Sequence, residues 1–462
     1  MLGNVTRSAV RSSLVAALAA LATFVMALTA TVTAAVTLTA TALIVPGTGT
    51  PNPEAVSDYM EHAVDYYVRP TTESCAVQCT PQPVEYLAQF WPFPFEGWGG
   101  LSGAKLDESV ASGVAQLTSD LVGTYRPGPA SQIVIFGYSQ GATVASREKA
   151  LLAKLSPQDQ ADISFVLIGN PNRPNGGLFE RLAPFGTVPI LDATFGLPTP
   201  TDTGMATTDI AFQYDGVADF PLYPLNILAT LNAVAGFWYT HGSYLSPDGR
   251  HPDELPNGLT PAELATAIAD PANQQRIPGS DTAYILIPTP NLPLLQPLRD
   301  FGSFTGTGFI TRPLIDLIEP ALRVLIETGY DRSLPYGQPA PLRLVPLINP
   351  ITLAVDLADA VAQGVRDAAA EIGTSAPPAP AAPVTVNPPA RTGQPPAAQA
   401  VASGSDRSPS PLTTRIRTPK VAAATTSAGS VDGRPRSAAA PRSTRGTKME
   451  SRTHRPGRAE AA

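Results

Sequence analysis

The sequence predicts an α/β fold, in which helices flank a central, mostly parallel sheet and are followed by additional C-terminal helices and a disordered tail. Two observations support this prediction. Short apolar runs that are typical of buried strands alternate along the chain with longer segments of helical period. One of these runs, residues 133–136, also leads through a G-x-S-x-G sequence directly into a helical segment.

Residues 137–141 indicate a nucleophile elbow, a sharp strand-to-helix turn that exposes a serine at the strand tip. Gly137 and Gly141 suit the two sides of this turn, which approach each other closely, because glycine has no Cβ to clash. Ser139 is the candidate nucleophile, and the backbone N–H of Gln140 is a candidate donor to an oxyanion. A bare G-x-S-x-G sequence is a weak signal. The flanking strand and helix favour an α/β-hydrolase elbow over an ordinary tight turn that carries an exposed serine.

Charge is distributed unevenly over the 462 residues. Residues 374–462 contain 13 Lys and Arg and 4 Asp and Glu, whereas the preceding residues contain 18 basic and 34 acidic side chains. The acidic body lacks the clustered Lys and Arg of a phosphate-reading surface, so we expect no nucleic-acid binding. The tail has almost no large apolar residue, so we expect residues 374–462 to be disordered. Its basic residues suit either contact with acidic lipid or polymer, or plain solvation.

Residues 1–34 have the layout of an export signal. Arg7 and Arg11 precede an apolar run from Leu14 to Leu28, and small residues surround a possible cleavage site near Ala34. The apolar run is also long enough to span a bilayer if it is not cut, so a signal peptide and a membrane anchor both stay open. We therefore expect an exported protein, secreted or membrane-anchored in the cell envelope, with residues 35–373 as its folded domain.

The first core strand is predicted at residues 36–45, and a turn-rich loop follows at residues 46–53. In a serine hydrolase this loop supplies a second oxyanion donor, for which the Thr48 backbone N–H is the candidate. The alternative is a glycine-rich turn that serves packing only. A helix is expected over residues 54–68, with Asn52 as its cap.

Cys75 and Cys79 are the two cysteines of the chain. In an exported protein such a pair is expected to form a disulfide. The alternative is a metal site, but no further cysteine and no nearby histidine would complete its ligands, so we expect no metal.

The remaining pattern continues the alternation of strands and helices. Strands are expected at 84–91, 163–168, 188–191, 210–214 and 282–287, and helices at 106–122 and 224–236. Apolar helices broken by proline are expected at about 291–300, 312–328 and 346–370. With so few charges these last helices must cover something, and the substrate site is one candidate.

A serine hydroxyl needs a base to take its proton and an acid to orient that base. The order Ser, Asp or Glu, His along the chain leaves His241 and His251 as candidate bases. We favour His241, which follows a helix, because His251 lies in a polar turn. The acid is expected near a strand end between the serine and the histidine. Asp215 is favoured, Asp219 is the alternative acid, and Asp192 is a weaker third candidate.

Several further motifs resemble those of the PE-PPE domain of mycobacterial proteins. They are Gly47-Thr48-Gly49-Thr50-Pro51, the elbow at residues 137–141, Asn170-Pro171-Asn172-Arg173-Pro174-Asn175-Gly176-Gly177, Tyr214-Asp215-Gly216-Val217-Ala218-Asp219-Phe220-Pro221, His241-Gly242, Pro288-Thr289-Pro290 and Gly329-Tyr330-Asp331-Arg332. The resemblance covers roughly residues 36–332. It departs from the family pattern at the N-terminus, where an apolar segment stands in place of a PE or PPE helical domain.

The resemblance implies a cutinase-like serine α/β-hydrolase with esterase, lipase or acyltransferase activity and no cofactor. By position, Ser139, Asp215 and His241 match the triad expected in that family. The resemblance extends the expected substrates to acyl esters that include cell-envelope lipids. The departure at the N-terminus favours a general export signal or anchor over the specialised route that PE and PPE domains serve.

We therefore predict an exported serine hydrolase that cleaves or transfers acyl groups of carboxylic esters through an acyl-enzyme. The acceptor is water or a sugar hydroxyl, and the sequence leaves that choice open. The alternative is a non-catalytic envelope protein that retains the hydrolase fold to bind lipid or a partner.

Overall fold

A seven-stranded sheet forms the centre of the computed structural model, which describes residues 40–124, 132–249 and 254–375. Its strand order is β2-β1-β3-β4-β7-β9-β8, and every neighbouring pair is parallel except β8 with β9. The strands are β1 (Ala40–Val45), β2 (Cys79–Pro83), β3 (Gln132–Tyr138), β4 (Ile163–Ile168), β7 (Thr207–Phe212), β8 (Gln274–Arg276) and β9 (Thr282–Ile287). The α/β fold class predicted from the sequence is confirmed.

Alternating side chains of the central strands fill two cores, one on each face of the sheet. In β3, Val134 and Phe136 belong to one buried cluster, whereas Ile133 and Ile135 belong to the other. Because both faces are buried, the strands read as continuous apolar runs rather than as alternating ones. This is why they were recognisable in the sequence.

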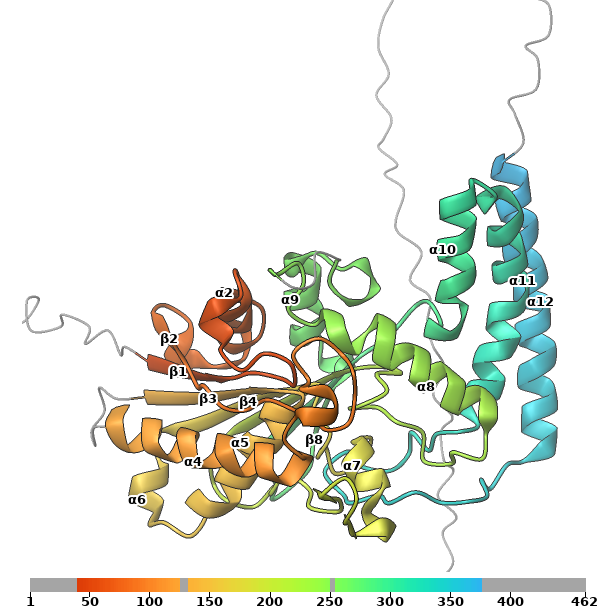
Figure 1. Cartoon of the computed structure of the whole chain (residues 1–462). Coiled ribbons are helices and arrows are strands. Elements are labelled where there is room, and N and C mark those ends of the chain that lie inside the picture. The colour runs from red at the N-terminus through yellow and green to blue at the C-terminus, as the bar shows by residue number, and fades with distance from the viewer. Residues whose placement is uncertain (1–39, 125–131, 250–253, 376–462) are drawn as a thin grey trace, which may run out of the picture. The chain divides into compact units, whose positions relative to one another are not determined.

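Helices cover both faces of the sheet (Figure 1). The first face is covered by α2 (Tyr59–His62), the π-helical segment η2 (Ala63–Val68), α3 (Arg69–Thr71) and α9 (Pro261–Ala269). The second is covered by α4 (Leu106–Thr124) and α5 (Gln140–Leu152). Shorter elements are α6 (Pro157–Gln160), α7 (Leu178–Arg181), the hairpin of β5 (Thr187–Val188) and β6 (Ala193–Thr194), and the 3-10 turns η1 (Pro53–Ala55), η3 (Glu73–Cys75), η4 (Gly100–Ser102), η5 (Ala183–Phe185), η7 (Pro256–Gly258), η8 (Pro271–Asn273) and η9 (Pro293–Leu295).

The C-terminal helices are α10 (Gln296–Thr305), α11 (Gly308–Glu327) and α12 (Pro350–Ser375). The backbones of α11 and α12 come close at Gly364, where a Cβ would lie 2.1 Å from the Leu317 carbonyl oxygen. Ile315 and Ile326 of α11 share a buried cluster with Ala229 of α8 (Ile227–Tyr239). None of the helices in the described parts of the chain is both long and apolar enough to cross a membrane.

Three expected elements differ from the structure. In place of a strand at residues 188–191, the two-residue strand β5 pairs with β6, and residues 189–192 form the turn between them. The strand expected at residues 84–91 is absent, and residues 79–83 form the edge strand β2 instead. An edge strand tolerates Pro81 and Pro83 because its outer N–H groups need no partner in the sheet. The apolar residues that suggested a strand at 84–91 pack against α4. The helix expected over 54–68 is interrupted before Tyr59, because Asp58 adopts a left-handed conformation with φ of 65°.

Candidate active site

Ser139 occupies a strained turn between β3 and α5, with φ of 55° and ψ of −119°. Few non-glycine residues adopt such a conformation, and those that do concentrate at functional sites. The neighbouring glycines make the turn possible. A Cβ on Gly137 would lie 2.7 Å from the Gly141 carbonyl oxygen, and a Cβ on Gly141 would lie 2.1 Å from the Val45 carbonyl oxygen. The elbow expected from the G-x-S-x-G sequence is present, with Ser139 at its tip.

Three side chains that lie far apart in the sequence form one hydrogen-bonded series. The Oγ atom of Ser139 lies 2.9 Å from Nε2 of His241, and Nδ1 of His241 lies 3.0 Å from Oδ2 of Asp215. His241 starts the short turn η6 (His241–Ser243) directly after α8, and Asp215 follows the C-terminal end of β7. With Nδ1–H donating to the carboxylate, Nε2 is left as the acceptor for the serine proton.

The Asp215 carboxylate is fully buried and accepts hydrogen bonds at both oxygens. Oδ2 accepts from His241 and from the Tyr244 hydroxyl, the latter at 2.7 Å, and Oδ1 accepts from the Val217 N–H at 2.8 Å. A buried charge is tolerable only when it is paired and hydrogen-bonded, and these three donors meet that requirement. The arrangement is suited to holding an imidazole in one orientation.

The His241 ring is enclosed by residues that the sequence motifs did not single out as neighbours of the base. A Cβ on Gly169, which directly follows β4, would lie 2.8 Å from Cε1 of His241. The ring of Phe237 stacks on the imidazole with centroids 5.8 Å apart, and the Tyr138 hydroxyl donates to the His241 carbonyl. The glycine after β4 was visible in the sequence, but its role depends on which strand lies between β3 and β7.

The alternative acid, Asp219, takes part in a different set of contacts. Its Oδ1 pairs with Nη1 of Arg332 at 2.7 Å, and its Oδ2 accepts from the Tyr214 N–H at 2.9 Å. Tyr214 has φ of 68°, so Asp219 supports the strained backbone just before Asp215. The weaker candidate Asp192 lies between β5 and β6, where its carbonyl accepts from the Asp107 N–H.

The remaining histidines were the alternatives for the base. His62 lies in α2, where its Nδ1 is 2.8 Å from the Leu245 carbonyl oxygen. His251 and His454 lie outside the described residues, as do the expected segments 1–34 and nearly all of 374–462.

The two candidate oxyanion donors belong to segments that adjoin Ser139. Gln140 is the first residue of α5, where an N–H has no acceptor within the helix. Thr48 belongs to the loop after β1. This loop lies close to the serine, since a Cβ added to Gly47 would be 3.2 Å from Cβ of Ser139. Within the described residues, neither the Gln140 nor the Thr48 backbone N–H donates to a protein acceptor. Both are therefore available to a ligand.

Hydrogen bonds fix the Gln140 side chain, which is buried. Its Oε1 accepts from Oγ of Ser109 at 2.9 Å, and its Nε2 donates to the Gln89 carbonyl at 3.0 Å. Ser109 Oγ in turn accepts from the Gln89 N–H at 2.9 Å. This network ties the start of α5 to α4 and to the segment after β2.

A cluster of aromatic rings, which we call the aromatic bridge, connects the loop of residues 89–103 to α8. Its members are Phe90, Phe93, Phe95, Trp98, Phe237 and Trp238. Trp98 lies 6.4 Å from Phe237 between ring centroids, and its Cδ1 would be 3.1 Å from a Cβ on Gly49. The bridge thus contacts both the loop that carries Thr48 and the helix that precedes His241. Several of its rings are exposed, including Trp238 at 66%.

Cys75 and Cys79 are joined by a disulfide, as expected. Among the described residues, no group of three or more His, Cys, Asp or Glu side chains could hold a metal ion.

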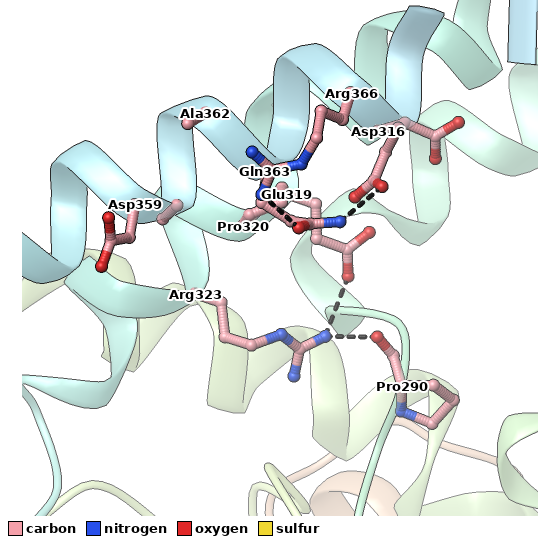
Figure 2. Close-up of a pocket in the computed structure, with 11 residues that line it drawn as sticks. Pro290, Asp316, Glu319, Pro320, Arg323, Asp359, Ala362, Gln363 and Arg366 are labelled. Carbon is pink, nitrogen blue, oxygen red and sulfur yellow. Dashed lines mark hydrogen bonds and ion pairs between the residues drawn. The ribbon is translucent and has the colours of Figure 1, made fainter. Parts of the chain in front are cut away.

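A pocket of about 720 Å³ lies between α11 and α12, but it contains none of the residues above (Figure 2). Several of its polar and charged side chains pair with protein groups. Arg323 contacts Glu319 at 3.0 Å and the Pro290 carbonyl, and Gln363 bonds to Arg366 and Asp367 (Figure 2). The pocket offers no activated nucleophile, so we assign the candidate active site to Ser139, His241 and Asp215.

The PE-PPE domain matches residues 77–331. "Esterase PE16" of Mycobacterium tuberculosis is 40% identical over 327 residues, which cover 69% of this chain and 54% of that protein. "SL1278 acyltransferase Chp1" of the same species is 30% identical over 336 residues, which cover 70% of this chain and 68% of that protein. The chain thus spans about half to two thirds of the length of such relatives. Among solved structures, a cutinase-like protein from Cryptococcus sp. is 19% identical, with a TM-score of 0.25, and the match covers 39% of this chain and 79% of that one.

Proposed function

The chain belongs to the PE-PPE domain family, and from that premise we propose that it is a serine hydrolase or acyltransferase acting on carboxylic esters. One observation carries the proposal. A serine in a strained elbow lies 2.9 Å from an imidazole nitrogen, and the other nitrogen of that ring lies 3.0 Å from a buried carboxylate. Relatives named as an esterase and as an acyltransferase support the same reaction class.

In the proposed mechanism, Oγ of Ser139 attacks the ester carbonyl while Nε2 of His241 takes the hydroxyl proton. Asp215 holds the imidazole and stabilises its protonated form. The backbone N–H groups of Gln140 and Thr48 donate to the oxyanion of the tetrahedral intermediate. His241 then returns the proton to the departing alcohol, which leaves an acyl group on Ser139.

The acyl group is next passed to water or to an alcohol, which His241 deprotonates in the same way. We propose a lipid or cell-envelope glycolipid as the ester substrate. Support comes from the exposed apolar surface next to the site, where the aromatic bridge continues along α8. Exposed side chains on that helix are Ile227, Leu231, Val234 and Trp238, spaced as one helical stripe.

We further propose that the protein is exported to the cell envelope, either secreted or membrane-anchored. The basic and apolar sequence of residues 1–34 supports this proposal. The disulfide between Cys75 and Cys79 is consistent with it, because structural disulfides persist in oxidising compartments.

A fluorophosphonate probe tests the proposal directly, since it labels a serine only when a neighbouring base activates it. We expect one adduct per chain by intact mass and its location on Ser139 by peptide mapping. A folded protein that takes no label would instead favour a non-catalytic protein that binds lipid or a partner.

A further inference from the structure

Tyr244 follows His241 by three residues and approaches the same carboxylate oxygen. Its hydroxyl donates to Oδ2 of Asp215 at 2.7 Å and accepts from the Phe212 N–H at 3.0 Å. Nδ1 of His241 lies 3.0 Å from that same Oδ2. One short segment therefore delivers two hydrogen-bond donors to one oxygen.

We propose that Tyr244 is a positioning residue for the reaction described above, and that its hydroxyl sets how strongly Asp215 attracts the proton of the imidazole. This inference rests on the proposed function. Tyr244 acts through Asp215, and the structure gives it no contact with Ser139 among the described hydrogen bonds and ring contacts.

The surroundings of Tyr244 direct the proton of its hydroxyl to the Asp215 carboxylate. The side chain is fully buried, and its ring packs edge-on against Phe212 with centroids 4.9 Å apart. Burial, followed by the nearby Asp215 charge, holds the pKa of Tyr244 well above its usual value. The hydroxyl therefore keeps its proton. Because the Phe212 N–H occupies a lone pair of the oxygen, that proton is directed to the carboxylate.

The consequence for the reaction has a definite sign. A neutral O–H donor to Oδ2 of Asp215 takes up part of the negative charge that the imidazolium would otherwise meet. Removing it leaves His241 facing a carboxylate that attracts its proton more strongly. The neutral imidazole, which is the form that accepts the Ser139 proton, then predominates only at higher pH.

Other titratable groups face this segment. Tyr138 donates to the His241 carbonyl, Tyr67 donates to the Tyr244 carbonyl at 2.7 Å, and His62 contacts the Leu245 carbonyl. Tyr59 and Asp248 act electrostatically on Tyr138. Burial holds the pKa of Tyr138 and of Tyr67 well above the usual value, so neither titrates near neutral pH. His62 needs its own control.

The test compares the full chain with its Tyr244→Phe variant by measuring kcat/KM against pH with a short p-nitrophenyl ester. We expect the acidic limb of the profile to move to higher pH by roughly half to one unit and kcat to fall about tenfold. Tyr67→Phe is the matched control, because it removes the same atom from a buried tyrosine that bonds to the same segment. Tyr67→Phe and His62→Gln should both leave the acidic limb in place.

An acidic limb that coincides in the wild type and the Tyr244→Phe variant would overturn the inference, as would an equal shift in Tyr67→Phe. If Tyr244→Phe does not fold, 3-fluorotyrosine at position 244 replaces it. Its more acidic hydroxyl should move the limb to lower pH, and no movement would equally overturn the inference. Fluorophosphonate labelling of the wild type is measured in parallel. No labelling removes the proposed function, whereas labelling with an unmoved limb removes only the role of Tyr244.

Discussion

Gly169 and His241 are in such close contact that a Cβ on the glycine would lie 2.8 Å from Cε1 of the imidazole. Gly169 also has φ of 53°, in the left-handed region. It directly follows β4, which lies between β3 and β7 in the sheet. We infer that the imidazole reaches both Ser139 and Asp215 because a residue without a side chain follows the intervening strand.

We predict that Gly169→Ala lowers kcat about 100-fold, since displacing a reacting group by about 1 Å costs that much. Gly186→Ala is the matched control, because Gly186 has φ of 56° but a Cβ added to it would meet no atom within 4 Å. Both variants should lose roughly 1 kcal/mol of stability from the left-handed backbone, and only Gly169→Ala should lose activity. Kinetics and thermal unfolding separate the two effects, and equal activity in all three proteins would contradict the prediction.

We predict that Asp215→Asn mainly lowers activity, whereas Asp219→Asn mainly lowers stability. Asp215→Asn should lower kcat about 10³- to 10⁴-fold with little change in KM, because the amide cannot hold the imidazole in the required tautomer. Asp219→Asn should mainly lower the free energy of unfolding, by roughly 1–3 kcal/mol, because the amide removes the charge that pairs with Arg332 and keeps one acceptor oxygen where the carboxylate bonds through two. Activity assays and chemical denaturation of both variants check this. A greater catalytic loss in Asp219→Asn would reverse the assignment of the acid.

We predict that Ser139→Ala abolishes turnover of a p-nitrophenyl ester, with a loss of about 10³-fold or more, and leaves the circular dichroism spectrum unchanged. The reason is that no other hydroxyl lies on Nε2 of His241 in the described structure. Ser156→Ala, at the exposed cap of α6, is the control and should keep full activity. Undiminished turnover in Ser139→Ala would remove the mechanism.

Trp98→Ala tests the aromatic bridge. Trp98 packs against Gly49 and Phe237, so its loss should loosen both the Thr48 loop and the helix that precedes His241. We expect kcat/KM to fall about tenfold, as a partial loss of alignment at the oxyanion donors. Trp91→Ala, whose ring lies under Lys105, is the control. Similar kinetics for both variants would show that the bridge does not support the site.

Glu180 gives a prediction about stability and pH. It is buried in α7, its Oε2 has no hydrogen-bond partner in the described structure, and burial raises its pKa to about 7 despite the opposing effect of Arg181. A carboxyl group whose pKa is raised in the folded state stabilises the fold fully at pH values below its unfolded-state pKa of about 4.3. This contribution to the free energy of unfolding is lost as the pH rises through about 7.

Glu180→Gln should therefore match the wild type near pH 4.5 and exceed its free energy of unfolding by roughly 2 kcal/mol at pH 8. This figure is smaller than the full pKa shift implies, because solvent screens part of the buried charge. Thermal unfolding over this range, with exposed Glu73→Gln as control, measures the difference. A constant gap between Glu180→Gln and the wild type at all pH values would contradict the prediction.

The sequence was informative where one local pattern decides the structure. The apolar runs of β3, β4 and β9 and the helical period of α4 and α5 predicted those elements closely, because each is buried along its length or along one face. The turn around Ser139 was equally recognisable, since it needs glycine at the two positions where a Cβ would clash with nearby backbone.

Features that depend on distant partners were not recognisable. Strand β2 contains two prolines and few apolar residues, and its pairing is decided by its place at the edge of the sheet. The contacts of Gly169 and Tyr244 with the candidate active site depend on strand order and on the path of the chain after α8. A single sequence contains neither.

The strand order also sets the distance between the ends of β3 and β7. With neighbouring strands about 4.8 Å apart, the ends of β3 and β7 are separated by roughly 9.6 Å, which matches one imidazole with a hydrogen bond on each side. An imidazole supplied by a segment outside the sheet can therefore join residues at the ends of two strands that are separated by one strand. Placing the serine, histidine and aspartate in another parallel sheet would require one strand between the serine and aspartate strands. It would also require a residue without a side chain after that intervening strand.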